Sequence, residues 1–153
     1  MCSLLKSLTL GLGLMLGSQA LAQDISHLEA EPQTPSGKFL TATEVKPILG
    51  ATQSSWVAVR EFQGQDLLYV THLWSWRCGL AQMELSLNDG PYEIWPMPDC
   101  HAQDAAPGAI LDGDGDPYRR FELGSVQSIG VRLVYDDLST AEVHFDRAAV
   151  LMP

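Results

Sequence analysis

The stretch "LAQMELSLNDGPYEIWP", residues 80–96, gives the clearest indication of the fold. Its odd positions from Ala81 to Leu87 are apolar, and the even positions between them are polar. Side chains of a β-strand point alternately to opposite faces, so this pattern is typical of a strand with one buried face. The turn signal "NDG" follows, and the prolines at 96 and 98 indicate that the returning strand lies at a sheet edge.

Strand patterns recur on both sides of this hairpin. They occupy residues 56–62 and 65–76 before it, and residues 126–135 and 141–152 after it. The stretch 65–76 is longer than most strands, so we expect a bend or bulge in it near residues 71–75. Short strands separated by turns predict a mostly β fold, either an antiparallel sandwich or a strongly curved sheet.

One short helix is expected near the N-terminus. Thr41 and Glu44 have the spacing of a capping box, which marks a helix start. Pro47 lacks an N–H group and should limit or bend this helix to about two turns. Gly50 is placed to end it.

The first residues have the pattern of an export signal. Lys6 is followed by an apolar stretch at 8–16, and Ala20 and Ala22 form an A-x-A cleavage pattern. We therefore expect residues 1–22 to be a cleaved signal peptide, and the mature chain to be periplasmic or extracellular. Residues 23–39 are predicted to be a flexible N-terminal segment, and residues 40–153 a single β domain without a transmembrane segment.

The charge of the mature chain limits its partners. It carries 19 acidic residues against eight Lys and Arg, because only Lys6 lies in the predicted signal. This balance argues against nucleic acid, whose phosphates require a basic surface. It is compatible with a basic partner protein, an envelope component or cations, although an acidic surface that only confers solubility is the favoured interpretation.

Two cysteines remain after the predicted cleavage, Cys78 and Cys100. If Leu87 faces Pro91 across a three-residue loop, counting outward places Cys78 opposite Cys100. The apolar alternation favours a register shifted by one residue, but both registers bring the cysteines together. We predict a disulfide, in preference to a reactive thiol or a zinc site.

The candidate binding residues are His72, Trp74, Trp76 and Trp95. On an extended strand the first three share one face with Cys78, and that row is either core or an aromatic contact surface. The core interpretation is favoured for the row itself, yet the sheet around the tryptophans is the best candidate for a contact surface. His72 is also a candidate acid, base or ligand.

Two further groups carry possible chemistry. Asp112, Asp114 and Asp116 alternate as at the start of a calcium loop, although proline and leucine occupy the positions of its glycine and glutamate. His144 and Asp146 share an outward face, but no nucleophile motif accompanies them.

Taken together, these features favour a non-catalytic, exported binding or accessory module of the cell envelope that uses no cofactor. The alternatives are a small envelope hydrolase that uses His72 or His144, and a calcium-stabilised structural domain.

Overall fold

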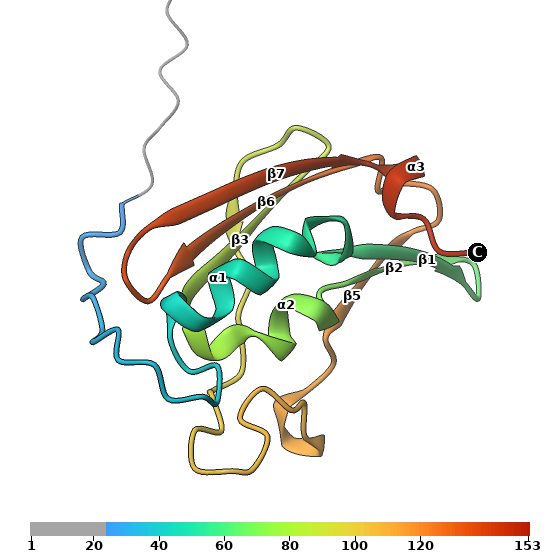
Figure 1. Ribbon diagram of the computed structural model, residues 1–153. Helices are drawn as coiled ribbons and strands as arrows, with labels where there is room; N and C mark the ends of the chain where they lie inside the picture. Colours follow the sequence, from blue (N-terminus) through green and yellow to red (C-terminus); the bar gives the residue numbers. More distant parts are fainter. Residues whose placement is uncertain (1–23) are drawn as a thin grey trace, which may run out of the picture.

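The computed structural model describes residues 24–153, so the predicted signal peptide lies outside the described residues. Two antiparallel sheets, which do not close into a barrel, form most of the fold (Figure 1). The first sheet has the strand order β1-β2-β5 and the second the order β4-β3-β6-β7. The predicted mostly β architecture, a sandwich or curved sheet, is therefore confirmed.

The strands are β1 (Ala58–Phe62), β2 (Gln65–Tyr69), β3 (Leu80–Leu87), β4 (Glu93–Ile94), β5 (Tyr118–Glu122), β6 (Ser128–Tyr135) and β7 (Thr140–Asp146). The helices are α1 (Ala42–Ala51), α2 (Thr71–Ser75) and α3 (Arg147–Val150), with 3-10 turns η1 (Gln53–Ser55), η2 (Arg77–Gly79) and η3 (Asp112–Asp114).

One face of the four-stranded sheet forms the core. The register pairs Met83 with Leu133 and Leu85 with Val131 across β3 and β6. These side chains pack with residues of α1, such as Val45, in a single hydrophobic cluster. Burial of this apolar surface, worth roughly 25 cal/mol per Å², is the main stabilising contribution to the fold.

The opposite face of β3 is also buried, which the prediction of a half-buried strand missed. Glu84 is only 5% exposed, although it belongs to the polar half of the alternation. Arg132 on β6 lies opposite Glu84, and its guanidinium lies 3.9 Å from the ring centroid of Tyr92. A Cβ atom on Gly130 would lie 2.6 Å from the Tyr92 hydroxyl, so this tyrosine lies directly on the sheet. A polar layer therefore covers the second face.

Helix α1 begins as predicted and ends later than predicted. The Glu44 carboxylate accepts a hydrogen bond from the Thr41 N–H, which is one half of the expected capping box. Burial acts to raise the pKa of Glu44, but backbone N–H groups, including those of Gly37 and Leu40, lower it to about 2. The helix continues through Pro47 to Ala51, so the prediction of two turns ending at Gly50 was too short. Packing against the sheets compensates for the hydrogen bond that proline lacks.

The predicted long strand 65–76 is wrong, and its second half is helix α2. Strand β2 ends at Tyr69, and the Val70 N–H donates to the Pro117 carbonyl oxygen. The Trp74 N–H then donates to the Val70 carbonyl oxygen, and this hydrogen bond starts a helical turn. Val70, Leu73, Trp74 and Arg77 are all buried, at the i, i+3, i+4, i+7 spacing of one helix face.

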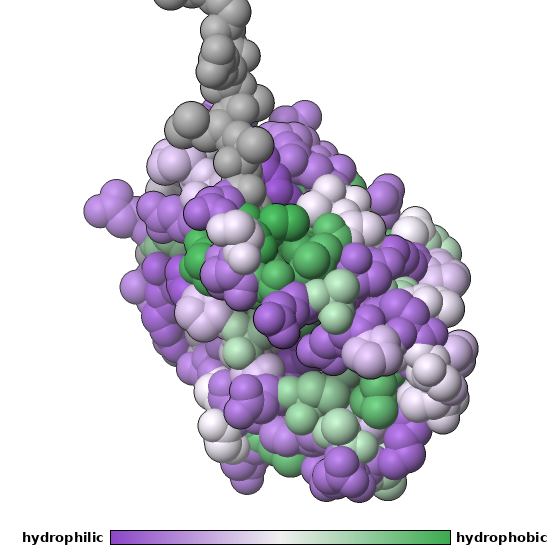
Figure 2. Space-filling model, turned by 90° about the vertical axis from the view of Figure 1, so that its left-hand side faces the viewer, coloured by the Kyte–Doolittle hydropathy of each residue, from purple (hydrophilic) through white to green (hydrophobic). Residues whose placement is uncertain are grey.

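The N-terminal segment lacks regular secondary structure but contacts the domain. Both the Glu31 N–H and the Gln33 side chain donate to Asp136, in the turn between β6 and β7. The face of the molecule on this side is mainly hydrophilic, and its hydrophobic areas are separated by polar side chains (Figure 2). No helix within residues 24–153 has the length and apolarity that crossing a membrane requires.

Candidate functional site

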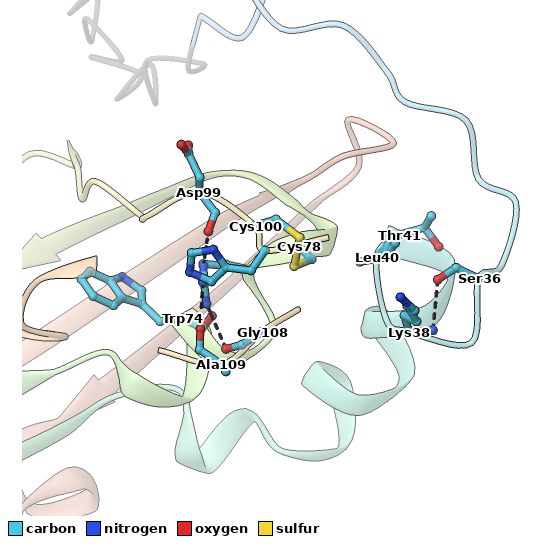
Figure 3. Close-up of a disulfide and its surroundings, with 12 residues drawn as sticks. Ser36, Lys38, Leu40, Thr41, Trp74, Cys78, Asp99, Cys100, Gly108 and Ala109 are labelled. Atoms are coloured by element: carbon cyan, nitrogen blue, oxygen red, sulfur yellow. Dashed lines mark hydrogen bonds between the residues drawn. A yellow bond between two sulfur atoms is a disulfide. The ribbon is translucent and has the colours of Figure 1, made fainter. Parts of the chain in front are cut away.

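Arg77 is the centre of a buried hydrogen-bond cluster. Its side chain is only 2% exposed. The guanidinium donates to the carbonyl oxygens of Trp74 at 2.8 Å, Asp99 at 3.0 Å, Gly108 at 2.9 Å and Ala109 at 3.0 Å. Figure 3 shows these four residues, Trp74, Asp99, Gly108 and Ala109, gathered around the hydrogen bonds of this cluster. Arg77 therefore holds the long 96–117 loop, defined as residues 96–117 between β4 and β5, against helix α2.

Asp114 completes this cluster. One of its carboxylate oxygens lies 3.4 Å from Arg77 Nη2, and both lie 3.0 Å from His101 Nε2. The hydrogen bond from the Leu111 N–H, followed by that from His101, lowers the pKa of Asp114. Burial lowers the pKa of Arg77, and the nearby carboxylates of Asp114 and Asp99 oppose that change. Asp114 thus acts as an internal anchor of the loop.

The predicted disulfide between Cys78 and Cys100 is confirmed. Strands β3 and β4 pair Glu84 with Ile94, which is the register of the three-residue loop. The disulfide lies beside the carbonyl groups that Arg77 binds (Figure 3). Because Cys78 follows Arg77 in the sequence, the disulfide attaches the 96–117 loop a second time to the same part of the chain.

Four of the predicted site residues meet in one pocket. This pocket, called here the Trp95 pocket, has a volume of about 310 Å³. The residues that matter for its chemistry are Trp74, Trp95, Asp114, Asp116, Tyr118 and Arg119. Both tryptophans are 5% exposed, so they form its wall and are not a flat exposed surface. The pocket lies where the 96–117 loop meets both sheets.

A cation already contacts the aromatic wall of the Trp95 pocket. The Arg119 guanidinium lies 4.0 Å from the centroid of the Trp95 ring, a distance at which a cation–π interaction is favourable. Arg119 is on β5 and Trp95 directly follows β4, so this contact joins the two sheets. No local sequence pattern identifies such a pair, because its two residues belong to different sheets.

The loop beside this pocket is acidic. The 96–117 loop contains five aspartates and no lysine or arginine. Asp112 and Asp116 are exposed, whereas Asp114 is directed to Arg77 and His101. Within residues 24–153, no group of three His, Cys, Asp or Glu side chains is arranged to hold a metal ion. The calcium site stays a prediction.

His72 lines a separate pocket. This His72 pocket has a volume of about 510 Å³, and its polar wall includes Ser55, Arg60, Tyr69, Thr71, His72 and Ser75. The Thr52 hydroxyl donates its proton to the Ile48 carbonyl oxygen at 2.7 Å. Its contact with His72 Nε2, at 2.8 Å, therefore requires Nε2 to be the donor. Burial lowers the pKa of His72, which favours the neutral ring. Because Nε2 already carries a proton, it cannot take one from Thr52.

Trp76 lies in neither of these pockets. It is partly buried and packs edge-on against Phe39, with ring centroids 5.3 Å apart. The predicted row of His72, Trp74 and Trp76 does not exist, because residues two apart on a helix point about 200° apart. Trp74 lines the Trp95 pocket, whereas His72 and Trp76 remain close to each other on another side, with ring centroids 6.5 Å apart.

His144 is exposed, as predicted, in a cluster on the polar face of the four-stranded sheet. Its Nε2 lies 3.2 Å from the Tyr92 hydroxyl and 3.5 Å from the Glu142 carboxylate. The Tyr92 hydroxyl donates to Glu142 at 2.8 Å, and burial and this carboxylate raise the pKa of Tyr92 to about 12. Tyr92 is therefore protonated at neutral pH and acts as a hydrogen-bond donor.

Comparison of the chain with protein-family models, with curated proteins and with solved structures finds no match. The function of these sites must therefore be argued from their own geometry.

Proposed function

We propose that the protein is a non-catalytic, exported binding module of the cell envelope, which recognises a basic segment of a partner protein at the Trp95 pocket. The observation that carries this proposal is the convergence of Trp74 and Trp95 with Asp114 and Asp116 in one pocket. Aromatic side chains that are nearly buried in a pocket are the usual anchors of protein interfaces.

The chemistry of the pocket fits a lysine or arginine side chain. The aliphatic part of such a side chain packs on an indole ring, and its charge interacts with the ring face and with a nearby carboxylate. Arg119 already occupies one such position, 4.0 Å from the Trp95 ring centroid. The exposed Asp116 supplies the carboxylate, and the remaining aspartates of the 96–117 loop steer a basic segment toward it.

An unsatisfied donor beside the pocket supports a ligand with carbonyl groups. Trp74 lines the pocket, and its indole Nε1 is buried with no hydrogen-bond partner within residues 24–153. Leaving a buried donor unpaired costs about 1–3 kcal/mol. A backbone carbonyl of a bound segment would satisfy this donor after a small rearrangement of the wall.

The Cys78–Cys100 disulfide supports the exported location. Structural disulfides persist in oxidising compartments and are rare in the cytosol. This agrees with the signal pattern in residues 1–22.

Tetralysine is a suitable probe of the proposed activity, with binding followed by tryptophan fluorescence and calorimetry at low salt. We expect Asp116→Asn to weaken binding about threefold, the size of one exposed ion pair. Asp104→Asn is the matched control, because Asp104 is exposed in the same loop but does not line the pocket. Its effect should be smaller than twofold.

Arg119→Gln gives the sharpest result. Arg119 competes with a ligand for the Trp95 ring, so its removal should strengthen tetralysine binding although Arg119 is close to the ligand. Weaker binding by this variant, or equal effects of the two aspartate variants, would refute the proposed site.

The hydrolase alternative is favoured by one observation, which is that His72 lines a pocket of about 510 Å³. Hydrolysis of p-nitrophenyl acetate by the wild-type protein and by His72→Ala tests it. Turnover that requires His72 would replace the binding proposal with an enzymatic one.

A further inference from the structure

The charge on the wall of the His72 pocket is opposite in sign to the net charge of the protein. The chain carries 19 acidic residues and nine basic ones, yet no acidic residue of the described chain lines this pocket. Among the described residues that line the pocket, Arg60 is the only one with a formal charge at neutral pH. With an arginine and no carboxylate on its wall, the pocket accepts an anion more readily than the acidic 96–117 loop does.

The charge of Arg60 is available to a ligand. Arg60 is exposed and forms no ion pair within residues 24–153; its guanidinium lies 4.9 Å from the ring centroid of Phe62. Other basic residues, such as Arg132 and Arg147, are held by carboxylates. A guanidinium without a carboxylate partner at a pocket wall is suited to bind a carboxylate with two parallel hydrogen bonds.

An aromatic surface continues from the pocket wall. Strand pairing places Tyr69 of β2 directly opposite Tyr118 of β5. Their ring centroids are 5.0 Å apart, and Tyr69 is partly exposed. Tyrosine rings at the edge of a pocket provide rigid contact area with a polar end.

The remaining polar groups of the pocket suit hydroxyl groups. His72 donates through Nε2 to Thr52, so its neutral Nδ1, which has no partner within residues 24–153, is an acceptor. Ser55 and Thr71 are exposed and add hydroxyls that both donate and accept. An acceptor nitrogen, hydroxyls, an aromatic ring and one arginine together match a sugar ring that carries a carboxylate.

We propose that the His72 pocket binds a sugar acid: Arg60 pairs with the carboxylate, Tyr69 packs against the ring, and His72 Nδ1 accepts a hydrogen bond from a sugar hydroxyl. The sugar acid and the proposed basic segment would occupy different pockets, so the two binding activities are tested separately. A nucleic acid fits less well, because the net charge of the protein opposes a chain of phosphates.

Isothermal titration calorimetry with trigalacturonate tests this inference, with the methyl ester of the same trisaccharide as the uncharged comparison. We expect the wild-type protein to bind the acid about threefold more tightly than the ester, the size of one exposed ion pair. Arg60→Gln should weaken binding of the acid about threefold and leave binding of the ester unchanged. Arg60 is exposed, so this variant is expected to fold.

Two variants separate direct contact from general effects. Arg120→Gln removes the same charge from an arginine that does not line the pocket, and it should change the affinity less than twofold. His72→Phe removes the acceptor and should weaken both acid and ester, because both carry the hydroxyl. The inference is overturned if acid and ester bind equally, if Arg120→Gln matches Arg60→Gln, if millimolar trigalacturonate does not bind, or if oligo(dT) competes at equal affinity.

Discussion

Replacing Arg77 with methionine removes the guanidinium that holds the 96–117 loop and keeps much of the side-chain volume. The change leaves four backbone carbonyls and the Asp114 carboxylate without this donor, in a site where Arg77 is 2% exposed. Removing one partner of a buried ion pair costs about 3–5 kcal/mol. The unpaired carbonyls add to this cost, whereas water that enters beside the loop reduces it. We therefore expect the free energy of unfolding to fall by about 3–5 kcal/mol, a large fraction of the 5–15 kcal/mol typical of a domain.

Urea denaturation followed by tryptophan fluorescence, with the disulfide intact, measures this loss. Arg120→Met is the matched control, because Arg120 is exposed and its hydrogen bonds to Gln65 and Tyr118 are 3.3 Å long. This control should change stability by no more than about 0.5 kcal/mol. The loss of stability in Arg77→Lys should lie between those of Arg77→Met and Arg120→Met, since an ammonium group cannot reach all the acceptors of a guanidinium. A loss below about 1 kcal/mol for Arg77→Met would show that the loop does not depend on this residue.

Three other measurements test the arrangement. Cys78→Ser should lower stability by about 3 kcal/mol, because the bond to Cys100 closes a loop with a sequence separation of 22; equal stability with and without reductant would contradict this. The melting temperature should be the same in calcium and in chelator, since Asp114 is already bound within the loop, and a higher value in calcium would establish the metal site. The hydrogen bonds from Arg147 lower the pKa of Asp66 from 3.8 to about 2, so the stability that Asp66 contributes is present above about pH 4 and lost as the pH falls toward 2. Asp66→Asn should flatten that part of the stability profile, and an unchanged acid transition would argue against this ion pair.

The strands could be predicted where local alternation and burial agree. In β6 and β7 the apolar residues alternate, and the register pairs Val131 with Val143 on the core face. In β3 the same alternation misled, because Tyr92 and Arg132 cover the polar face. Whether a second layer covers a polar face depends on distant residues, and one strand's sequence does not contain that information.

Helix α2 was in principle detectable. Val70, Leu73, Trp74 and Arg77 have helical spacing, but an arginine does not count as apolar in a hydrophobic pattern. The aromatic and β-branched residues of this stretch favoured a strand instead. That error placed Trp74 on the same face as His72 and Trp76, and it also hid the burial of Arg77.

The candidate site was predictable in composition but not in geometry. Trp74 and Trp95 were selected as large aromatics and Asp116 as part of the acidic loop, and all three line the Trp95 pocket. Arg119 was missed because its contact with Trp95 joins two sheets that have no local connection. The His72 pocket was missed as a cavity, because residues from β1, β2 and α2 converge there only after folding.

The anchoring of the 96–117 loop bears on the proposed function. Apart from the short turn η3, this loop has no regular secondary structure, and a free loop would lose roughly 1–2 kcal/mol of backbone entropy per residue when a ligand orders it. Arg77, Asp114 and the disulfide restrict the loop through interactions within the protein, before any ligand is present. The loop therefore loses its backbone entropy during folding and not during binding. A ligand at the Trp95 pocket meets aromatic walls that are already in position.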